Sequence, residues 1–396
     1  MDPKNPDTGG RPTGIRIFSE FDDIHVTWNL IRLNDLAGYN VYRKTADDTI
    51  FSLYRRLEVD EREFIDYNVE YDTRYSYRIT AVGVDFETPA SDSVSIIPGP
   101  SVIWATDADN QRIIKISHDG IHTISNSTVL GFPWDIEITD RRENYWYSDI
   151  FYGSIYHIES SELTRYASVN YSDPVDIDFD SRRNILWGAN RAGSILRISS
   201  VVVDTIQEIR DVFIVTPLSV AVSGLEGDCW VADPGSNRIY RLDASGESRT
   251  VIQDFFMNPK DIIYNENDHT LWVADSTRVV HLSFDGEYLT EINYPFRDAN
   301  QLSVNKENGD LWVIDGGGLS AEPKILKFDA ELTLAASTSG FSFPRNLVVN
   351  LADSGCVVAD VGSGKIVRLT NEGKILGETE GYYFPYGLAI EYPRFF

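Results

Sequence analysis

A unit of about 42 residues recurs seven times after residue 101, and this repeat constrains the fold more than any other feature. The unit is clearest at 228–246, where DCWVADPGSNRIYRLDASG combines an apolar run, a turn sequence and an alternating run. That combination predicts a β-hairpin. The apolar runs start 40 to 45 residues apart, at Trp104, Trp146, Trp187, Trp230, Trp272, Trp312 and Val357. Such a period is typical of architectures built from four-stranded units.

A further predicted strand precedes every hairpin except the first, and one more follows the last hairpin. These strands start at Pro133, Pro174, Pro217, Pro259, Ala299, Pro344 and Pro385. The start of the repeat region therefore lacks the first strand of a blade, and the end of the region has one such strand without a hairpin. We expect the C-terminal strand to complete the blade that begins after residue 101, which closes a ring of seven blades and leaves no open sheet edge.

The repeats resemble the NHL family of β-propellers, whose unit runs from Pro-x-x-(Ile/Leu) through Trp-Val-Ala-Asp to Asn-Arg-Ile. The resemblance covers about residues 102–392, with departures at Asn190, Ala299 and Val357 and an insertion around 316–322. It implies a propeller fold but no particular activity, because propellers host many unrelated functions.

Residues 13–97 contain seven short alternating segments, which fit an immunoglobulin-like sandwich. This segment resembles a fibronectin type III domain through Trp28, the run GYNVYR, and TRYSYRITAV, where Tyr75 fits the tyrosine-corner position. The resemblance implies a spacer or docking module and a location in the periplasm, at the cell surface or outside the cell. A cytoplasmic location stays open.

The expected organisation is thus all-β in two domains. We predict a flexible segment over 1–12, the sandwich over 13–97, a Pro-Gly linker over 98–101 and the propeller over 102–396. A chain of 396 residues is long enough for two domains. Its two cysteines, Cys229 and Cys356, occupy equivalent strand positions three repeats apart, too far for a disulfide, so we expect buried free thiols.

The formal net charge is −26 at pH 7. This charge repels phosphate backbones and anionic lipids, which argues against nucleic acid as a partner. No apolar run reaches the length of a membrane span.

Four carboxylates form the most notable cluster. Residues two and four places after each proline share a strand face, and in the second and third blades these are Asp135 and Glu137, then Asp176 and Asp178. Oxygen ligands on adjacent strands suit a hard cation such as Ca²⁺. The alternative is an acidic, water-filled channel lining.

The residue directly after each proline is expected at the mouth of the channel. Aromatic and basic side chains occur there, namely Trp134, Lys260, Arg345 and Tyr386. Such a mixture favours recognition of a peptide or a sugar. Ordinary loop packing is the alternative.

No catalytic residue is assigned. The Asp that ends each Trp-Val-Ala-Asp run is interpreted as a cap for turn amides, and His157 and His281 fall in an outward, polar slot. The sequence therefore favours a non-catalytic binding or assembly protein of the cell envelope or exterior, whose partner is a protein, peptide or glycan. A metal-dependent, lactonase-like hydrolase or lyase and a structural subunit of a larger surface assembly are the alternatives.

Overall fold

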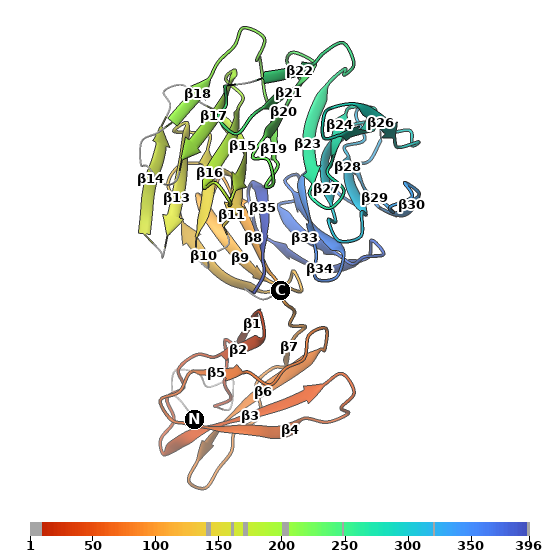
Figure 1. The fold of residues 1–396 in the computed structure, drawn as a ribbon. Coiled ribbons are helices and arrows are strands. Elements are labelled where there is room, and N and C mark those ends of the chain that lie inside the picture. The colour runs from red at the N-terminus through yellow and green to blue at the C-terminus, as the bar shows by residue number, and fades with distance from the viewer. Residues whose placement is uncertain are drawn as a thin grey trace. The chain divides into compact units, whose positions relative to one another are not determined.

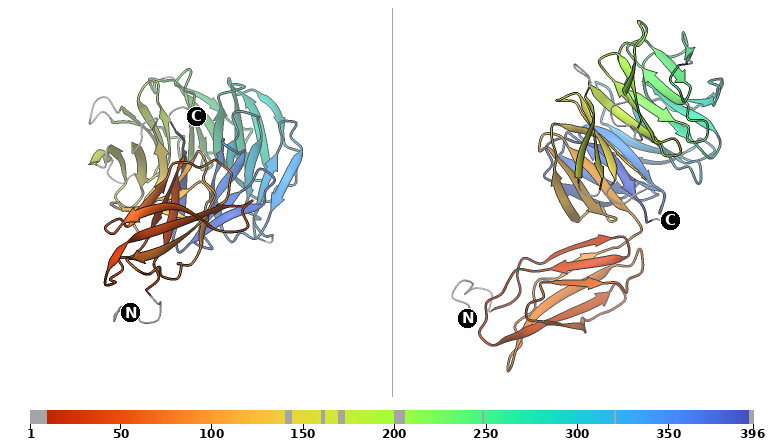
Figure 2. Two further views of the ribbon diagram at one scale, coloured as in Figure 1. Left: turned by 90° about the horizontal axis from the view of Figure 1, so that it is seen from below. Right: turned by 60° about the vertical axis from the view of Figure 1, so that its left-hand side comes forward.

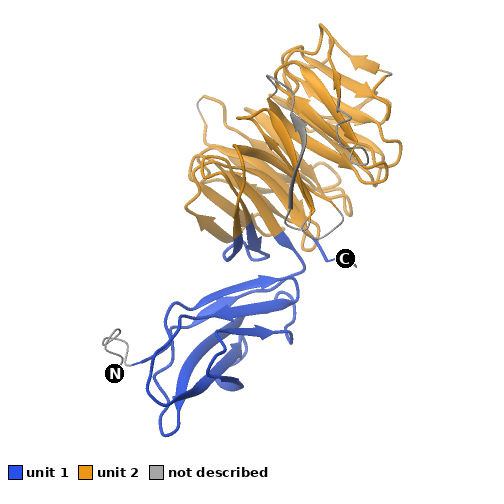
Figure 3. Ribbon diagram, turned by 90° about the vertical axis from the view of Figure 1, so that its left-hand side faces the viewer, with its two compact units in different colours: residues 1–102, 115–125, 392–396 blue, residues 103–114, 126–391 orange. Residues whose placement is uncertain are grey.

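The computed structural model describes residues 10–139, 144–159, 162–168, 173–199, 206–247, 249–319 and 321–393. These residues contain strands, turns and loops. They form two compact units, one of residues 1–102, 115–125 and 392–396 and the other of residues 103–114 and 126–391 (Figure 3). The domain boundaries proposed from the sequence stay predictions, and most of the segment 1–12 lies outside the described residues. Within the described part of the chain, no helix has the length and apolarity needed to cross a bilayer.

The first unit holds a two-sheet sandwich. One sheet has the order β1(Arg16–Glu20), β2(Asp23–Thr27), β5(Glu63–Asp66), and the other β4(Ser52–Glu58), β3(Leu36–Thr45), β6(Tyr75–Gly83), β7(Val94–Ile96). Both sheets contribute to one core that includes Ile24, Trp28 and Tyr77. The Tyr75 hydroxyl accepts a 2.9 Å hydrogen bond from the backbone N–H of Glu70, five residues upstream. That contact is the one a tyrosine corner makes.

The remaining strands form seven four-stranded antiparallel sheets, and Figures 1 and 2 show them from three directions. In the order of the blades, and from the first strand of each sheet to the last, they are β35(Pro385–Glu391), β8(Val102–Asp107), β9(Arg112–Ser117), β10(Thr123–Thr128); β11(Pro133–Ile138), β12(Tyr145–Asp149), β13(Ser154–Glu159), β14(Glu162–Ser168); β15(Pro174–Asp180), β16(Ile185–Asn190), β17(Ser194–Ser199), β18(Ile206–Ile209); β19(Ser219–Val222), β20(Cys229–Asp233), β21(Arg238–Leu242), β22(Arg249–Ile252); β23(Pro259–Asn265), β24(Thr270–Asp275), β25(Arg278–Ser283), β26(Tyr288–Glu291); β27(Ala299–Val304), β28(Leu311–Asp315), β29(Lys324–Phe328), β30(Leu334–Thr338); and β31(Pro344–Asn350), β32(Gly355–Asp360), β33(Lys365–Leu369), β34(Ile375–Glu380).

The first strands of the sheets contact one another in a complete circle, from β11 through β15, β19, β23, β27 and β31 to β35 and back to β11. They lie at the centre of the unit in Figure 1, whereas β14, β18, β26 and β30 lie at its periphery. The C-terminal strand β35 joins β8, β9 and β10, which confirms the predicted closure. The fold class is therefore all-β, a sandwich followed by a seven-bladed propeller.

The Asp residues at the ends of the second strands cap backbone amides, as predicted. Asp233 accepts hydrogen bonds of 2.8 and 2.9 Å from the N–H groups of Val215 and Thr216, which lead into the first strand of the same blade. In the first blade Asp107 does the same for Tyr383 and Phe384, across the closure. Each cap satisfies amides that would otherwise lack a partner beside a strand end.

A basic or imidazole side chain lies opposite the tryptophan of the second strand in most blades. His157 pairs with Trp146 across the ladder, and their ring centroids are 4.3 Å apart. His281 stacks on Trp272 at 3.9 Å. We expected both histidines to occupy an outward, polar position. This expectation was wrong for His157, because its side chain is buried. The burial lowers the pKa of His157. A flat neutral imidazole packs against the indole face and is thereby shielded from water.

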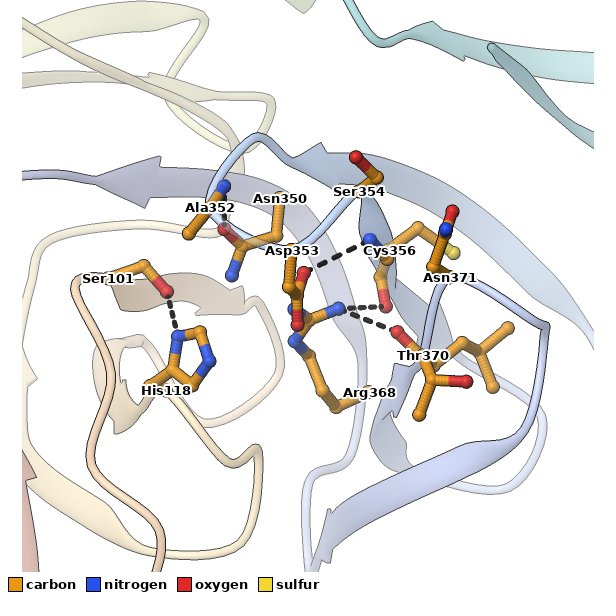
Figure 4. A network of polar contacts seen from close by, with 12 residues as sticks. Ser101, His118, Asn350, Ala352, Asp353, Ser354, Cys356, Arg368, Thr370 and Asn371 are labelled. Atoms are coloured by element: carbon orange, nitrogen blue, oxygen red, sulfur yellow. Dashed lines mark hydrogen bonds and ion pairs between the residues drawn. The ribbon is translucent and has the colours of Figure 1, made fainter. Parts of the chain in front are cut away.

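The seventh blade has Val357 where the others have tryptophan, and its partner Arg368 compensates for the loss. Arg368 is fully buried and donates to the carbonyls of Cys356 and Leu369 at 3.1 and 2.7 Å. Its other terminal nitrogen is 2.5 and 2.6 Å from the two carboxylate oxygens of Asp353 (Figure 4). Arg368 lies directly opposite Val357 in the ladder. Cys229 and Cys356 are both free and buried, as expected.

Candidate functional site

A cavity of about 270 Å³ lies where the first strands of the blades begin. Two consecutive positions after each proline, or after Ala299, line most of it. We call the first set the rim residues, which are Trp134, Val175, Leu218, Lys260, Asn300, Arg345 and Tyr386. We call the second set the floor residues, which are Asp135, Asp176, Ser219, Asp261, Gln301 and Asn346.

Consecutive residues of a regular strand point to opposite faces, so rim and floor should not both reach one cavity. The register explains why they do. In β15, Pro174 pairs with Asn190 and Asp176 with Ala189, so Val175 is an extra residue in the ladder. The same shift occurs after the first residue of β11, β23, β27 and β31. A bulge of this kind re-aims a side chain, and here it adds the rim residues to the cavity.

The rim is divided into two arcs. Tyr386, Trp134, Val175 and Leu218, from four successive blades, form an apolar arc, and Lys260, Asn300 and Arg345 form a polar arc. The Trp134 and Tyr386 rings stack with centroids 4.1 Å apart, and Phe384 lies 5.3 Å from Trp134. The four residues predicted at the mouth, Trp134, Lys260, Arg345 and Tyr386, are therefore brought together in one cavity.

The floor side chains link neighbouring blades. Asp135 accepts a 2.9 Å hydrogen bond from the N–H of Ile177 in the next blade. Asp176 accepts one of 2.7 Å from Val220, and Asp261 one of 2.7 Å from Leu302. In each case the donor is the residue that directly follows the floor residue of the next blade. The carboxylates therefore satisfy amides on the exposed edges of the first strands.

Hydroxyl groups perform this role in other blades. Ser219 donates 2.7 Å to Asp261 and accepts from the N–H of Ile262 at 3.3 Å. In the first blade the floor position is Gly387, where a Cβ would lie 2.6 Å from the carbonyl oxygen of Trp134. There the Thr106 hydroxyl joins the blades, since it accepts from Gly387 at 2.8 Å and donates to Trp134 at 2.9 Å.

Below the floor, a second row of side chains continues the pattern. Asp178 accepts hydrogen bonds of 2.6 and 2.8 Å from the N–H groups of Val222 and Phe179. Ser303 accepts one of 3.0 Å from Val349. Glu137, in the same row, is half-buried.

Burial in the channel raises the pKa values of all these carboxyl groups. The pKa of Asp135 rises to about 7, and those of Asp178 and Asp261 to about 6, although backbone hydrogen bonds offset part of the effect. Burial and the charges of neighbouring acids raise the pKa values of Glu137 and Asp176 well above their ordinary range. The charged state of this cluster is therefore unfavourable without a counter-charge.

The predicted cation site uses four of these carboxylates, Asp135, Glu137, Asp176 and Asp178. The structure places all four on the adjacent strands β11 and β15. Three of them already use an oxygen to accept a backbone hydrogen bond. Among the described residues, no three His, Cys, Asp or Glu side chains are arranged to hold one metal ion. Calcium binding by this cluster stays a prediction.

The three cations at the cavity differ in how their charges are compensated. Arg191 pairs with Asp173 at 2.7 Å, and Lys260 pairs with Asp298. Arg345 is half-buried and its guanidinium carbon lies 3.7 Å from the centroid of the Phe343 ring. It has no ion pair with any carboxylate in the described ranges.

Sequence reasoning missed several residues of the site. Asp261 shares the proline offset of Asp135 and Asp176, and that offset could have added it to the acidic cluster. Phe343 and Phe384 precede their prolines, so no strand alternation indicated that they reach the cavity. Arg191 follows a second strand, and only the tertiary fold brings it to the mouth.

No protein-family model matches this sequence, and no curated protein matches it. Solved structures with a similar fold do exist. A protein of unknown function from Desulfotomaculum acetoxidans has a TM-score of 0.61 and 16% identity, over 74% of this chain and 99% of that one. A catalytically inactive histidine-to-alanine variant of virginiamycin B lyase from Staphylococcus aureus, solved with quinupristin, has a TM-score of 0.56 and 18% identity, over 72% and 92% of the two chains. At such identities the similarity establishes a propeller-like fold alone.

Proposed function

We propose that this chain is a non-catalytic binding protein that recognises a protein, peptide or glycan in the axial cavity of its propeller. The single observation that carries the proposal is the composition of the rim, where four apolar side chains face three polar ones above a floor of fixed acceptors. A concave site with apolar walls and a few placed polar groups is the usual form of a ligand pocket.

The finer assignments belong to the same proposal. Residues 13–97 would be a fibronectin type III spacer, supported by the contact between Tyr75 and Glu70, and the propeller would be of the NHL kind, supported by its sequence repeat. An envelope or extracellular location follows from the spacer resemblance.

A lyase or lactonase is the second candidate, because a solved propeller of similar fold is a lyase. That enzyme loses activity when one histidine is replaced by alanine. None of the described residues that line this cavity is histidine or cysteine. The carboxylates would have to act alone as general bases while they hold backbone amides.

The test is a binding screen of the full chain on peptide and glycan arrays, with Trp134→Ala as the matched variant. Binding that the variant loses, while its melting temperature is kept, supports the proposal. Turnover of lactones or esters that Asp135→Asn abolishes would instead establish the enzyme. Binding that is equal in both proteins would place recognition outside the cavity. A stable higher-order assembly without any ligand would favour a structural subunit.

A further inference from the structure

We infer that the axial cavity binds a sugar ring that carries a carboxylate, and that Arg345 is the residue that pairs with this carboxylate. The inference rests on the proposed binding function and names the class of ligand for the same cavity.

Arg345 is the first part of the argument. Its guanidinium is held over Phe343, which fixes the plane of the group and covers one of its faces. The other two cations of the cavity have carboxylate partners within hydrogen-bonding distance, and Arg345 has none among the described residues. A stacked guanidinium keeps its N–H groups free at the edge, and that edge matches a carboxylate with two parallel hydrogen bonds.

The apolar arc is the second part. Trp134, Tyr386 and Phe384 stack into one group of rings, and Val175 and Leu218 extend the apolar surface to the next two blades. This arc continues directly from Arg345 of the seventh blade to Tyr386 of the first. The C–H groups of a pyranose ring suit such a wall, because aromatic side chains contribute contact area at a low entropic cost.

The polar groups of the cavity are the third part, since most of them accept hydrogen bonds. Asp135 and Asp176 each accept a backbone amide through one carboxylate oxygen, which leaves the second oxygen in a defined position. Asp261 accepts the Leu302 amide through one oxygen and the Ser219 hydroxyl through the other. The buried Oδ1 atom of Asn300 has no hydrogen-bond partner within the described residues. Hydroxyl groups are the donors that would satisfy these acceptors, and a sugar carries several of them on one ring.

Other ligands fit less well. A phosphate or sulfate ester brings up to two charges close to a floor with three carboxylates. Of the cations at this cavity, Arg345 alone has no ion pair within the part of the chain that the structure describes. A neutral sugar would leave Arg345 without an anion. A free amine would suit the floor but would have to pass Lys260 and Arg345 at the rim. A cavity of about 270 Å³ is too small for an extended peptide and is sufficient for one ring at the end of a chain.

The test is isothermal titration calorimetry of the full chain with uronic acids, N-acetylneuraminic acid and short oligosaccharides that end in them. The neutral sugars of the same stereochemistry and a short peptide with a free C-terminal carboxylate are the comparison ligands. We expect at least one acidic sugar to bind about tenfold or more tightly than its neutral counterpart. Arg345→Gln should remove this preference, so that the acidic sugar binds no more tightly than its neutral counterpart.

Arg249→Gln is the charge-matched control, because Arg249 pairs with Asp211 away from the cavity. It should retain the preference, and all three proteins should show equal circular dichroism. The inference fails if no acidic sugar is preferred, or if the preference survives Arg345→Gln. The inference also fails if the peptide binds and no acidic sugar does. If Trp134→Ala then abolishes peptide binding, the proposed binding function of the cavity is still supported. Lactone or ester turnover without binding of any ligand would overturn both proposals.

Discussion

The indole nitrogen of Trp104 donates a 2.9 Å hydrogen bond to the carboxylate of Glu391, across 287 positions of the chain. The two residues come from the second strand and the first strand of one blade, which the two ends of the repeat region build together. Asp107 adds the caps of Tyr383 and Phe384 at the same closure. These contacts hold the ring shut without a covalent link.

Loss of the closing strand should destabilise the whole propeller. Deletion of 383–396 removes one strand of a sheet and opens the edge of β8, so we expect a large fall in the melting temperature or insoluble protein. The milder Glu391→Ala should lower the free energy of unfolding by about 1–3 kcal/mol, since it removes a hydrogen bond to a charged group. Glu378→Ala removes only an exposed partner of Lys365 and is the control. A deletion variant that melts like the full chain would refute the closed ring.

The propeller should become less stable as pH rises from 5 to 8. The folded-state pKa values of Asp135, Asp178 and Asp261, about 7, 6 and 6, lie above the ordinary value of 3.8. Between these values the folded chain binds more protons than the unfolded chain, so the free energy of unfolding falls as pH increases. Each group can contribute up to about 1.4 kcal/mol per pH unit in its window.

Thermal melts followed by tryptophan fluorescence at four pH values measure this slope. The variant Asp135→Asn plus Asp176→Asn keeps an oxygen acceptor at each position but cannot ionise. We expect it to show a flatter pH dependence than the native chain. A melting temperature that rises between pH 5 and 8 would contradict the raised pKa values.

A calcium titration followed by thermal melts tests the predicted cation site directly. A divalent ion among Asp135, Glu137, Asp176 and Asp178 would relieve their repulsion and stabilise the fold by mass action. Because three of these carboxylates already hold backbone amides, we expect an affinity no better than the weak extracellular range of about 10⁻⁴–10⁻³ M. The thermal shift should disappear in the double Asn variant. If no divalent ion shifts the melting temperature, the cluster is a channel lining only.

The repeat predicted most of the fold because its information is local and occurs many times. Three features recur at a fixed spacing: the proline at each first strand, the tryptophan of each second strand and the Asp that ends it. The interpretation of one hairpin therefore predicted the structure of all seven. The missing strand at Trp104 and the extra one at Pro385 then predicted the closure. The domain boundaries stay predictions, because they rest on composition and turn sequences rather than on the repeat.

The site was only partly predictable. Strand alternation predicted that Asp135 and Glu137 share one face, but it gave no hint of the bulge that adds Val175 and its equivalents to the cavity. Nor could it show that Asp135 and Asp176 accept amides from the next blade, because that contact depends on the distance between strands some 40 residues apart. That Arg345 forms no ion pair with the described residues also became visible only in three dimensions.

Arg368 offers a test of how the seventh blade tolerates Val357. Arg368→Ala should lower the free energy of unfolding by about 3 kcal/mol or more, because it strips a buried ion pair and leaves two carbonyls without their donor. The equivalent Arg197 of the third blade lies 5.7 Å from the Trp187 ring and is half-buried. Arg197→Ala should be destabilising by only about 1 kcal/mol. Equal effects in urea unfolding would show that Arg368 has no special role.

The bulge at the start of the first strands lets two consecutive residues face the cavity. One of them can contact a ligand while the other joins the blades, whereas a regular strand would direct only one of the two residues to the cavity. Floor residues hold the ring together, so their substitution endangers the scaffold, whereas the neighbouring rim residues make few of these bonds. Specificity can therefore diverge at the rim while the hydrogen bonds that join the blades at the floor are kept. A library that randomises Lys260, Asn300, Arg345 and Tyr386 would vary the ligand while it keeps the floor contacts that join the blades.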